Sequence, residues 1–218
     1  MTIEYRTFSE KGKRRSNQDV VRVVAGDENG RTIFILCDGM GGHFMGDIAA
    51  EFVAEHMSMN FPDDTADIDV TISRVAEELT GKYGIVEMGS TLVMACLKED
   101  TLTVVHCGDS RCYLLDKENG LRFVTEDHTV EGQMNSPLTR CVFAGYPDKA
   151  VPNIATMKVH KGNRIFLCSD GVSSYLRPDI LVARLMDDRS LDSIIDTITF
   201  LCEKQSADNY SGILIEIK

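Results

Sequence analysis

Segments with helical periodicity come in two pairs along this chain, and blocks of short apolar strands separate them. The pairs are expected at about 47–59 with 67–80, and at about 178–186 with 191–204. Strands are expected at 3–9, 20–25, 32–37, 91–97, 102–107, 112–115, 121–124, 154–159, 164–168 and 210–217. Because hairpins outnumber strand–helix–strand units, this order predicts an α+β fold in which helices cover mostly antiparallel sheets. A four-layer α-β-β-α sandwich with two central sheets would bury both sheets.

The composition indicates one globular domain in a reducing compartment. The 218 residues suffice for a well-buried core, and no linker or repeat divides them, so we expect a single domain over 1–218. No apolar run approaches the ~20 residues that span a membrane, and the polar start is no signal peptide. The seven cysteines lack a Cys-x-x-Cys pair and predict reduced thiols. We therefore expect a cytoplasmic monomer, and the net charge of −11 disfavours nucleic acid as a partner.

Four aspartates stand where apolar strands begin or end. Asp38 follows the run 33–37 and Asp170 follows 164–169, while Asp109 comes after 102–107 and Asp208 opens the last strand. A single Asp-Gly step is typical of a plain turn. If the last strand runs antiparallel beside 164–169, however, Asp208 lies beside Asp170, and gathered carboxylates repel one another. A hard divalent cation would remove this repulsion, and oxygen ligands select magnesium or manganese over zinc.

Several other phosphate-handling sites do not fit the sequence. The glycine-rich turn 38–43 links a strand to a helix, but Phe44 stands where the dinucleotide fingerprint needs glycine. No Walker motif occurs, and none of the seven cysteines has an arginine six positions later, as cysteine-dependent phosphatases require. An aspartyl-phosphate enzyme would use Asp-x-Asp, but Met40 stands two residues after Asp38. We therefore interpret the turn as part of a site that binds a metal ion first and phosphate second.

A set of short motifs occurs in one order along nearly the whole chain. They are Gly12-Lys13-Arg14 with Asn17-Gln18-Asp19, Cys37 to His43, Gly89-Ser90-Thr91, Gly108 to Arg111, Asp127-His128, Leu138-Thr139-Arg140, Cys168 to Gly171, and Asp208-Asn209. This ordered set resembles the protein phosphatase type 2C family of metal-dependent serine/threonine phosphatases, in its bacterial form. The resemblance implies the same α-β-β-α sandwich and the hydrolysis of phosphoserine and phosphothreonine in proteins.

The resemblance also implies the ligands of a metal centre. Asp38 would bridge two Mn²⁺ or Mg²⁺ ions, and the carbonyl of Gly39 would bind one of them. Asp170 and Asp208 would complete the other ion's ligands. Asp109, together with Asp170, would form a third metal site.

Three further residues take catalytic roles by the same resemblance. Asp19 would orient the water that the metals bind, and Arg14 would hold the substrate phosphate. Arg14, rather than Arg15, keeps the family's five-residue step to Asp19 without a gap. His43 would be a general acid, or else a polar residue that structures the turn. Both interpretations of His43 stay open, because the family's acid histidine directly follows the glycine, where this chain has Met40.

Retention of all four metal aspartates favours an active enzyme in which an activated water attacks phosphorus, with no covalent enzyme intermediate. Its partners would be phosphoproteins, the products of a serine/threonine kinase. Two alternatives stay open. One is a catalytically weak pseudophosphatase or phosphoprotein-binding regulatory module on the same fold, and the other is a purely acidic cation-binding protein.

The segment from Thr129 to Pro137 is shorter than the flap of the family and has few apolar residues. It predicts an open, shallow cleft with little discrimination between the sequences that flank a phosphorylated residue. Alternatively, the loop from Phe143 to Val151 folds over the site instead.

Overall fold

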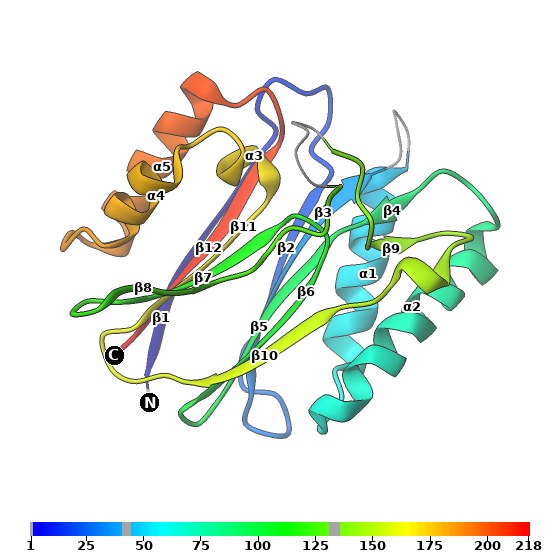
Figure 1. Cartoon of the computed structure of the whole chain (residues 1–218), viewed down its shortest axis with the longest axis horizontal. Coiled ribbons are helices and arrows are strands. Elements are labelled where there is room, and N and C mark those ends of the chain that lie inside the picture. Colours follow the sequence, from blue (N-terminus) through cyan, green and yellow to red (C-terminus); the bar gives the residue numbers. More distant parts are fainter. Residues whose placement is uncertain (1, 41–44, 131–135) are drawn as a thin grey trace.

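Two β-sheets pack face to face at the centre of the molecule, and a layer of helices covers the outer face of each sheet (Figure 1). The computed structural model describes residues 2–40, 45–130 and 136–218. One outer layer consists of α1 (Gly46–Asn60) and α2 (Ile68–Tyr83), and the other contains α4 (Pro178–Leu185) and α5 (Leu191–Gln205). The α+β sandwich predicted from the sequence is therefore confirmed.

One sheet has five antiparallel strands in the order β1-β12-β11-β7-β8. Their bounds are β1 (Ile3–Glu10), β7 (Arg111–Asp116), β8 (Gly120–Val124), β11 (Arg164–Cys168) and β12 (Tyr210–Ile217). β12 is buried along its whole length and pairs with β1 on one side and with β11 on the other. The predicted antiparallel pairing of the last strand with 164–168 is confirmed, and the first and last strands are neighbours.

The other sheet has seven strands in the order β10-β6-β5-β3-β4-β9, with β2 paired to β3 off this path. The bounds are β2 (Asp19–Val24), β3 (Thr32–Met40), β4 (Gly89–Ser90), β5 (Leu92–Lys98), β6 (Thr101–Cys107), β9 (Val142–Phe143) and β10 (Asn153–Lys158). The expected strands all occur, and their ends lie within three residues of the expected ones. Five short elements among the described residues were not predicted: β4, β9, the 3-10 helices η1 (Thr65–Asp67) and η2 (Pro147–Lys149), and α3 (Asp170–Ser173).

The apolar run that forms β3 is continuous because both faces of this strand are buried. Ile33 and Ile35 pack in the cluster under α1 and α2, whereas Phe34 and Leu36 pack in the cluster between the two sheets. Side chains alternate across a strand, so a strand covered on both faces needs apolar residues at every position. The seven cysteines are buried and free. No helix of the described residues is long and apolar enough to cross a membrane.

The loop from Phe143 to Val151 extends the seven-stranded sheet. Its first residue belongs to β9, which pairs with β4, and the 3-10 helix η2 (Pro147–Lys149) follows. The Lys149 ammonium lies over the rings of Phe143 and Tyr146, at 5.8 and 4.9 Å from their centroids. These contacts fix the loop locally.

Candidate active site

Strand ends from both sheets meet at one end of the sandwich, opposite the end where the chain termini lie in Figure 1. The seven-stranded sheet brings Asp19 at the start of β2, Asp38 near the end of β3, and Asp109 just after β6. Asp19 and Asp38 are direct partners across the antiparallel pair, so their carboxyls lie on the same face of the sheet. The five-stranded sheet brings Asp170 just after β11 and Asp208 just before β12.

The proximity of these carboxyls appears in their pKa values. Burial, and then the charges of Asp19 and Asp170, raise the pKa of Asp38 well above its ordinary value. Burial followed by Asp170 and then Asp127 raises the pKa of Asp109 to about 7. Burial and then Asp208 raise the pKa of Asp170. Each shift has the sign expected when partly buried carboxylates share a site in which nearby arginines compensate their charge only in part.

Asp19 is held differently from its neighbours. Burial raises its pKa to about 6, while the hydrogen bond from Ser169 opposes the rise. Its Oδ2 accepts a hydrogen bond from Ser169 over 2.8 Å, and its Oδ1 is buried without a partner among the described residues. An unpartnered buried carboxylate oxygen is costly, so this atom is a natural acceptor for a ligand.

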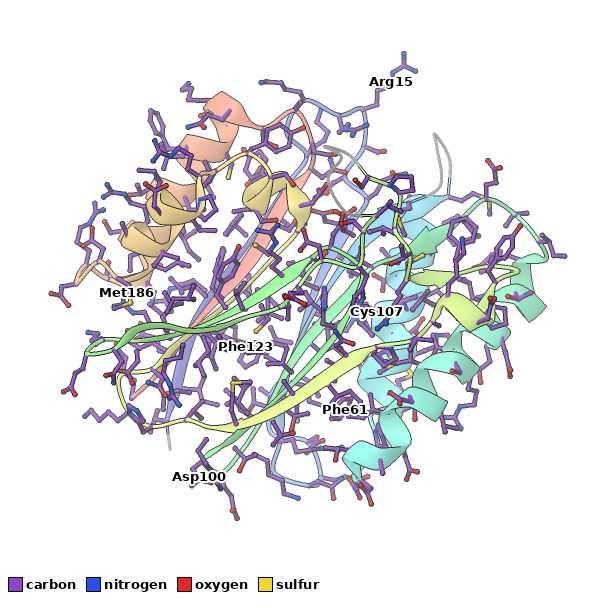
Figure 2. The ribbon with its side chains drawn as sticks, in the orientation of Figure 1. Arg15, Phe61, Asp100, Cys107, Phe123 and Met186 are labelled. Carbon is purple, nitrogen blue, oxygen red and sulfur yellow. The ribbon has the colours of Figure 1, made fainter. Side chains whose placement is uncertain are left out.

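Arg14 lies with the aspartates and Arg15 does not. The Arg14 Nη2 donates to the Asp208 Oδ2 over 2.6 Å, whereas Arg15 projects away from the body of the protein (Figure 2). Gly12 makes this approach of the loop to the last strand possible. Its φ is +57°, and a Cβ atom at this position would lie 2.2 Å from the carbonyl oxygen of Asp208.

The turn after β3 is fixed by close backbone contacts. A Cβ atom at Gly39 would lie 2.1 Å from the carbonyl oxygen of Gly46, which begins α1. The Asp38 N–H donates to the Thr91 hydroxyl, and the Thr91 N–H donates to the Asp38 carbonyl, each over 2.9 Å. These bonds fix the backbone that carries Asp38. His43 lies outside the described residues.

The donor set suits a hard divalent cation, since oxygens of carboxylates and a backbone carbonyl are the ligands that Mg²⁺ and Mn²⁺ prefer. Over 2–40, 45–130 and 136–218, however, no three His, Cys, Asp or Glu side chains converge closely enough to ligate one ion. The Asp208 carboxylate is instead paired with Arg14. After burial, the charges of the neighbouring carboxyls, those of Asp170 and Asp109 among them, raise the pKa of Asp38, so these groups lie close enough to interact.

A family model described as protein phosphatase 2C matches residues 9–211 of this sequence. The chain belongs to the protein phosphatase 2C family. The resemblance inferred from the ordered motifs is therefore confirmed, and so is the assignment to an enzyme class. The serine/threonine phosphatase Stp of Listeria welshimeri is 28% identical over 245 residues, which cover 99% of this chain and 96% of the relative.

Solved structures of the family have the same fold. The serine/threonine phosphatase Stp1 from Staphylococcus aureus has a TM-score of 0.85 at 23% identity, covering 100% of this chain and 96% of that one. The catalytic domain of the serine/threonine protein phosphatase PstP, in complex with two manganese ions, has a TM-score of 0.82 at 23% identity, covering 99% of each chain. At this identity the structures support the fold alone.

Three side chains around the site of this phosphatase were given no role in the sequence interpretation. Asp127 makes two hydrogen bonds of 2.7 Å to Arg111 and adds to the charge around Asp109. The Asn209 amide donates to the carbonyls of Lys11 and Ser16, which ties the arginine loop to the last strand. The third side chain is that of Ser169, whose hydroxyl donates to the Asp19 carboxyl over 2.8 Å. Only membership in the ordered motifs pointed to Asp127, Asn209 and Ser169, because their partners are distant in sequence.

A cavity of about 540 Å³ lies between the edges of the two sheets and is lined partly by His106, Phe123 and Asn153. None of the predicted aspartates that the structure describes lines it. The ring of His106 is buried and lies 4.5 Å from that of His128, centroid to centroid. This cavity is therefore separate from the carboxylate cluster.

Proposed function

We propose that this phosphatase hydrolyses phosphoserine and phosphothreonine in proteins at a centre that holds two Mn²⁺ or Mg²⁺ ions. The ligands would be Asp38, the carbonyl of Gly39, Asp170 and Asp208, with Asp109 and Asp170 serving a third ion. The observation that carries the proposal is the meeting of half-buried carboxylates from both sheets at one end of the sandwich, where burial and their mutual charges raise their pKa values. The manganese found with PstP supports the choice of metal.

The bound ions would neutralise the phosphoryl oxygens and activate water near neutral pH. Asp19 would orient that water through Oδ1, the oxygen that no protein group occupies among the described residues. Because Oδ2 is held by Ser169, the carboxyl is fixed while its other oxygen accepts a hydrogen bond.

Arg14 would bind the phosphate with its guanidinium, whose planar fork matches two phosphate oxygens. Its side chain is 58% exposed, so a substrate can reach it from solvent. The ion pair of Arg14 with Asp208 is worth only about 0–1 kcal/mol at such exposure. A phosphate therefore displaces Asp208 from Arg14 at little cost.

The broader setting is proposed from the same features. The chain would act as one catalytic domain over 1–218, as a cytoplasmic monomer, on phosphoproteins made by a serine/threonine kinase. The net charge of −11 disfavours nucleic acid as a substrate. The open cleft remains a prediction, because residues 131–135 of the short segment lie outside the described residues.

A phosphoprotein-binding module without turnover is the second candidate. The observation that favours it is that no three His, Cys, Asp or Glu side chains among the described residues converge on one ion position. Release of inorganic phosphate from a phosphothreonine peptide, measured with Mn²⁺ and again with excess chelator, separates the two. The proposal expects turnover that needs the metal and that Asp38→Asn abolishes. Turnover that persists in chelator contradicts the metal mechanism. Peptide binding without phosphate release, in the presence of Mn²⁺, establishes the module instead.

A further inference from the structure

A hydrogen bond between a serine and an aspartate joins the two sheets at the carboxylate end. Ser169 directly follows β11 in the five-stranded sheet, and its Oγ donates to the Oδ2 of Asp19, the first residue of β2 in the seven-stranded sheet. The oxygens are 2.8 Å apart. Ser169 is 0% exposed and Asp19 is 8% exposed, so water does not compete freely for this bond.

The neighbouring contacts decide where the single hydrogen of the Ser169 hydroxyl goes. The Ser211 N–H donates to the same Oγ over 3.0 Å, and the Ser169 N–H donates to the Ser211 carbonyl over 3.1 Å. The hydroxyl thus accepts from the backbone of β12 and keeps its hydrogen for Asp19. The Ser211 hydroxyl is itself bonded to Ser9 over 2.9 Å. The backbone of β12 therefore fixes the Ser169 hydroxyl as the donor of the hydrogen bond between the sheets.

The bond determines which oxygen of Asp19 faces a ligand. Asp19 and Asp38 are cross-strand partners, and the charge of Asp19 contributes to the raised pKa of Asp38. With Oδ2 occupied by Ser169, Oδ1 is left, buried and without a partner in the described part of the chain. A partial rotation of the carboxyl out of its present plane would break the bond to the opposite sheet, so the bond fixes the direction in which the other oxygen points.

We infer that Ser169 is a positioning residue for the metal centre. Its hydroxyl fixes Asp19 and holds the ligand Asp38 of one sheet against the ligand Asp170, which follows Ser169 in the other. This inference rests on the proposed function. A centre whose ligands come from two sheets depends on the distance between those sheets, so loss of the bond weakens metal binding. Groups that orient metal ligands typically change affinity or activity by about 10–100-fold.

Calorimetric titration of Mn²⁺ into the full chain, without substrate, measures this effect apart from catalysis. Ser169→Ala is expected to bind Mn²⁺ about 10–100-fold more weakly than the wild type. The matched control is Ser173→Ala, which lies four residues further on. Ser173 is also buried, at 7% exposure, and its hydroxyl has no partner among the described residues. The control should bind Mn²⁺ within about twofold of the wild type.

A double-mutant cycle tests whether Ser169 acts through Asp19. In an Asp19→Ala background, Ser169→Ala should weaken Mn²⁺ binding by no more than about a further twofold, because the two residues form one unit. An additional loss as large as in the wild type overturns the inference, since Ser169 would then act elsewhere. Wild-type affinity in Ser169→Ala, or an equal loss in Ser173→Ala, overturns it as well.

Circular dichroism of the chelated variants shows whether each one folds. If Ser169→Ala does not fold, Ser169→Cys decides, because it nearly preserves volume and replaces the hydroxyl by a weaker donor. Wild-type Mn²⁺ affinity in the cysteine variant refutes the inference, and a loss of about threefold or more supports it. A wild type that binds no Mn²⁺ and releases no phosphate refutes the proposed function. A wild type that does both, beside an unaffected Ser169→Ala, refutes only the role of Ser169.

Discussion

Replacing Asp109 by asparagine should stabilise the protein against unfolding in the presence of a chelator, although it removes a proposed metal ligand. Burial, and then the charges of Asp170 and Asp127, raise the pKa of Asp109 to about 7 in the fold. In an unfolded chain an aspartate titrates at about 3.9. The fold therefore holds the proton more tightly than the unfolded chain does. Its stability falls as the pH rises from about 4 to about 7, and the charged form is unfavourable above that range.

The magnitude follows from these two pKa values. A difference of about three units corresponds to about 4 kcal/mol at pH 8, since each unit is about 1.4 kcal/mol. Asp109 is partly exposed, and relaxation with water penetration reduces the effect to about 2 kcal/mol. Asparagine has the same shape and no charge. In a chain of this size, about 2 kcal/mol raises the melting temperature by about 4–8 °C.

Urea unfolding with excess chelator measures this at pH 8 and again near pH 4.5. The free energy of unfolding of Asp109→Asn should exceed that of the wild type at pH 8, and most of the gain should vanish at the lower pH. Asp148→Asn is the control, because Asp148 is exposed in η2 and should change stability by less than about 0.5 kcal/mol at either pH. Equal stability of wild type and Asp109→Asn at pH 8, or the same gain at both pH values, would refute the electrostatic argument.

Three other substitutions test the site. Asp170→Asn should abolish Mn²⁺-dependent phosphate release while circular dichroism stays native; turnover near the wild-type rate would contradict its role as a ligand. Arg14→Ala should lower kcat/KM for a phosphothreonine peptide by about 10²-fold, and Arg15→Ala by less than about threefold; the reverse order in steady-state kinetics would show that the phosphate lies on the other arginine. Gly171→Ala should cost about 3 kcal/mol or more in urea unfolding, because a Cβ atom there would lie 1.7 Å from the carbonyl oxygen of Asn209; an unchanged midpoint would rule this clash out.

The sequence could predict the layers because they depend on local periodicity. The strand β3 is apolar at every buried position, and the helices α2 and α5 carry apolar residues at helical spacing. The place of the carboxylates at strand ends was also visible, since each aspartate follows or precedes an apolar run. By contrast, the two-residue strands β4 and β9 are too short to show any alternation.

The contacts that orient the site could not be predicted, because they arise where the two sheets meet. Ser169 and Asp19 are 150 positions apart, and nothing local in either segment indicates that the hydroxyl of one reaches the carboxyl of the other. The same holds for Asn209, which binds a loop at the opposite end of the chain. Arg14 was placed near the site by motif spacing, but its contact with Asp208 depends on the backbone at Gly12.

The pairing of β1 with β12 has a consequence for how the protein is made. All eight residues of β1 pair with residues of β12, the final strand of this fold, from Ile3 opposite Ile217 to Glu10 opposite Tyr210. Before β12 is in place, β1 has no partner strand in this sheet, because β12 lies between β1 and β11. Asp208 reaches its place only when β12 docks between β1 and β11. The five-stranded sheet, and the proposed metal centre with it, is therefore completed only after Asp208 and β12 have been synthesised.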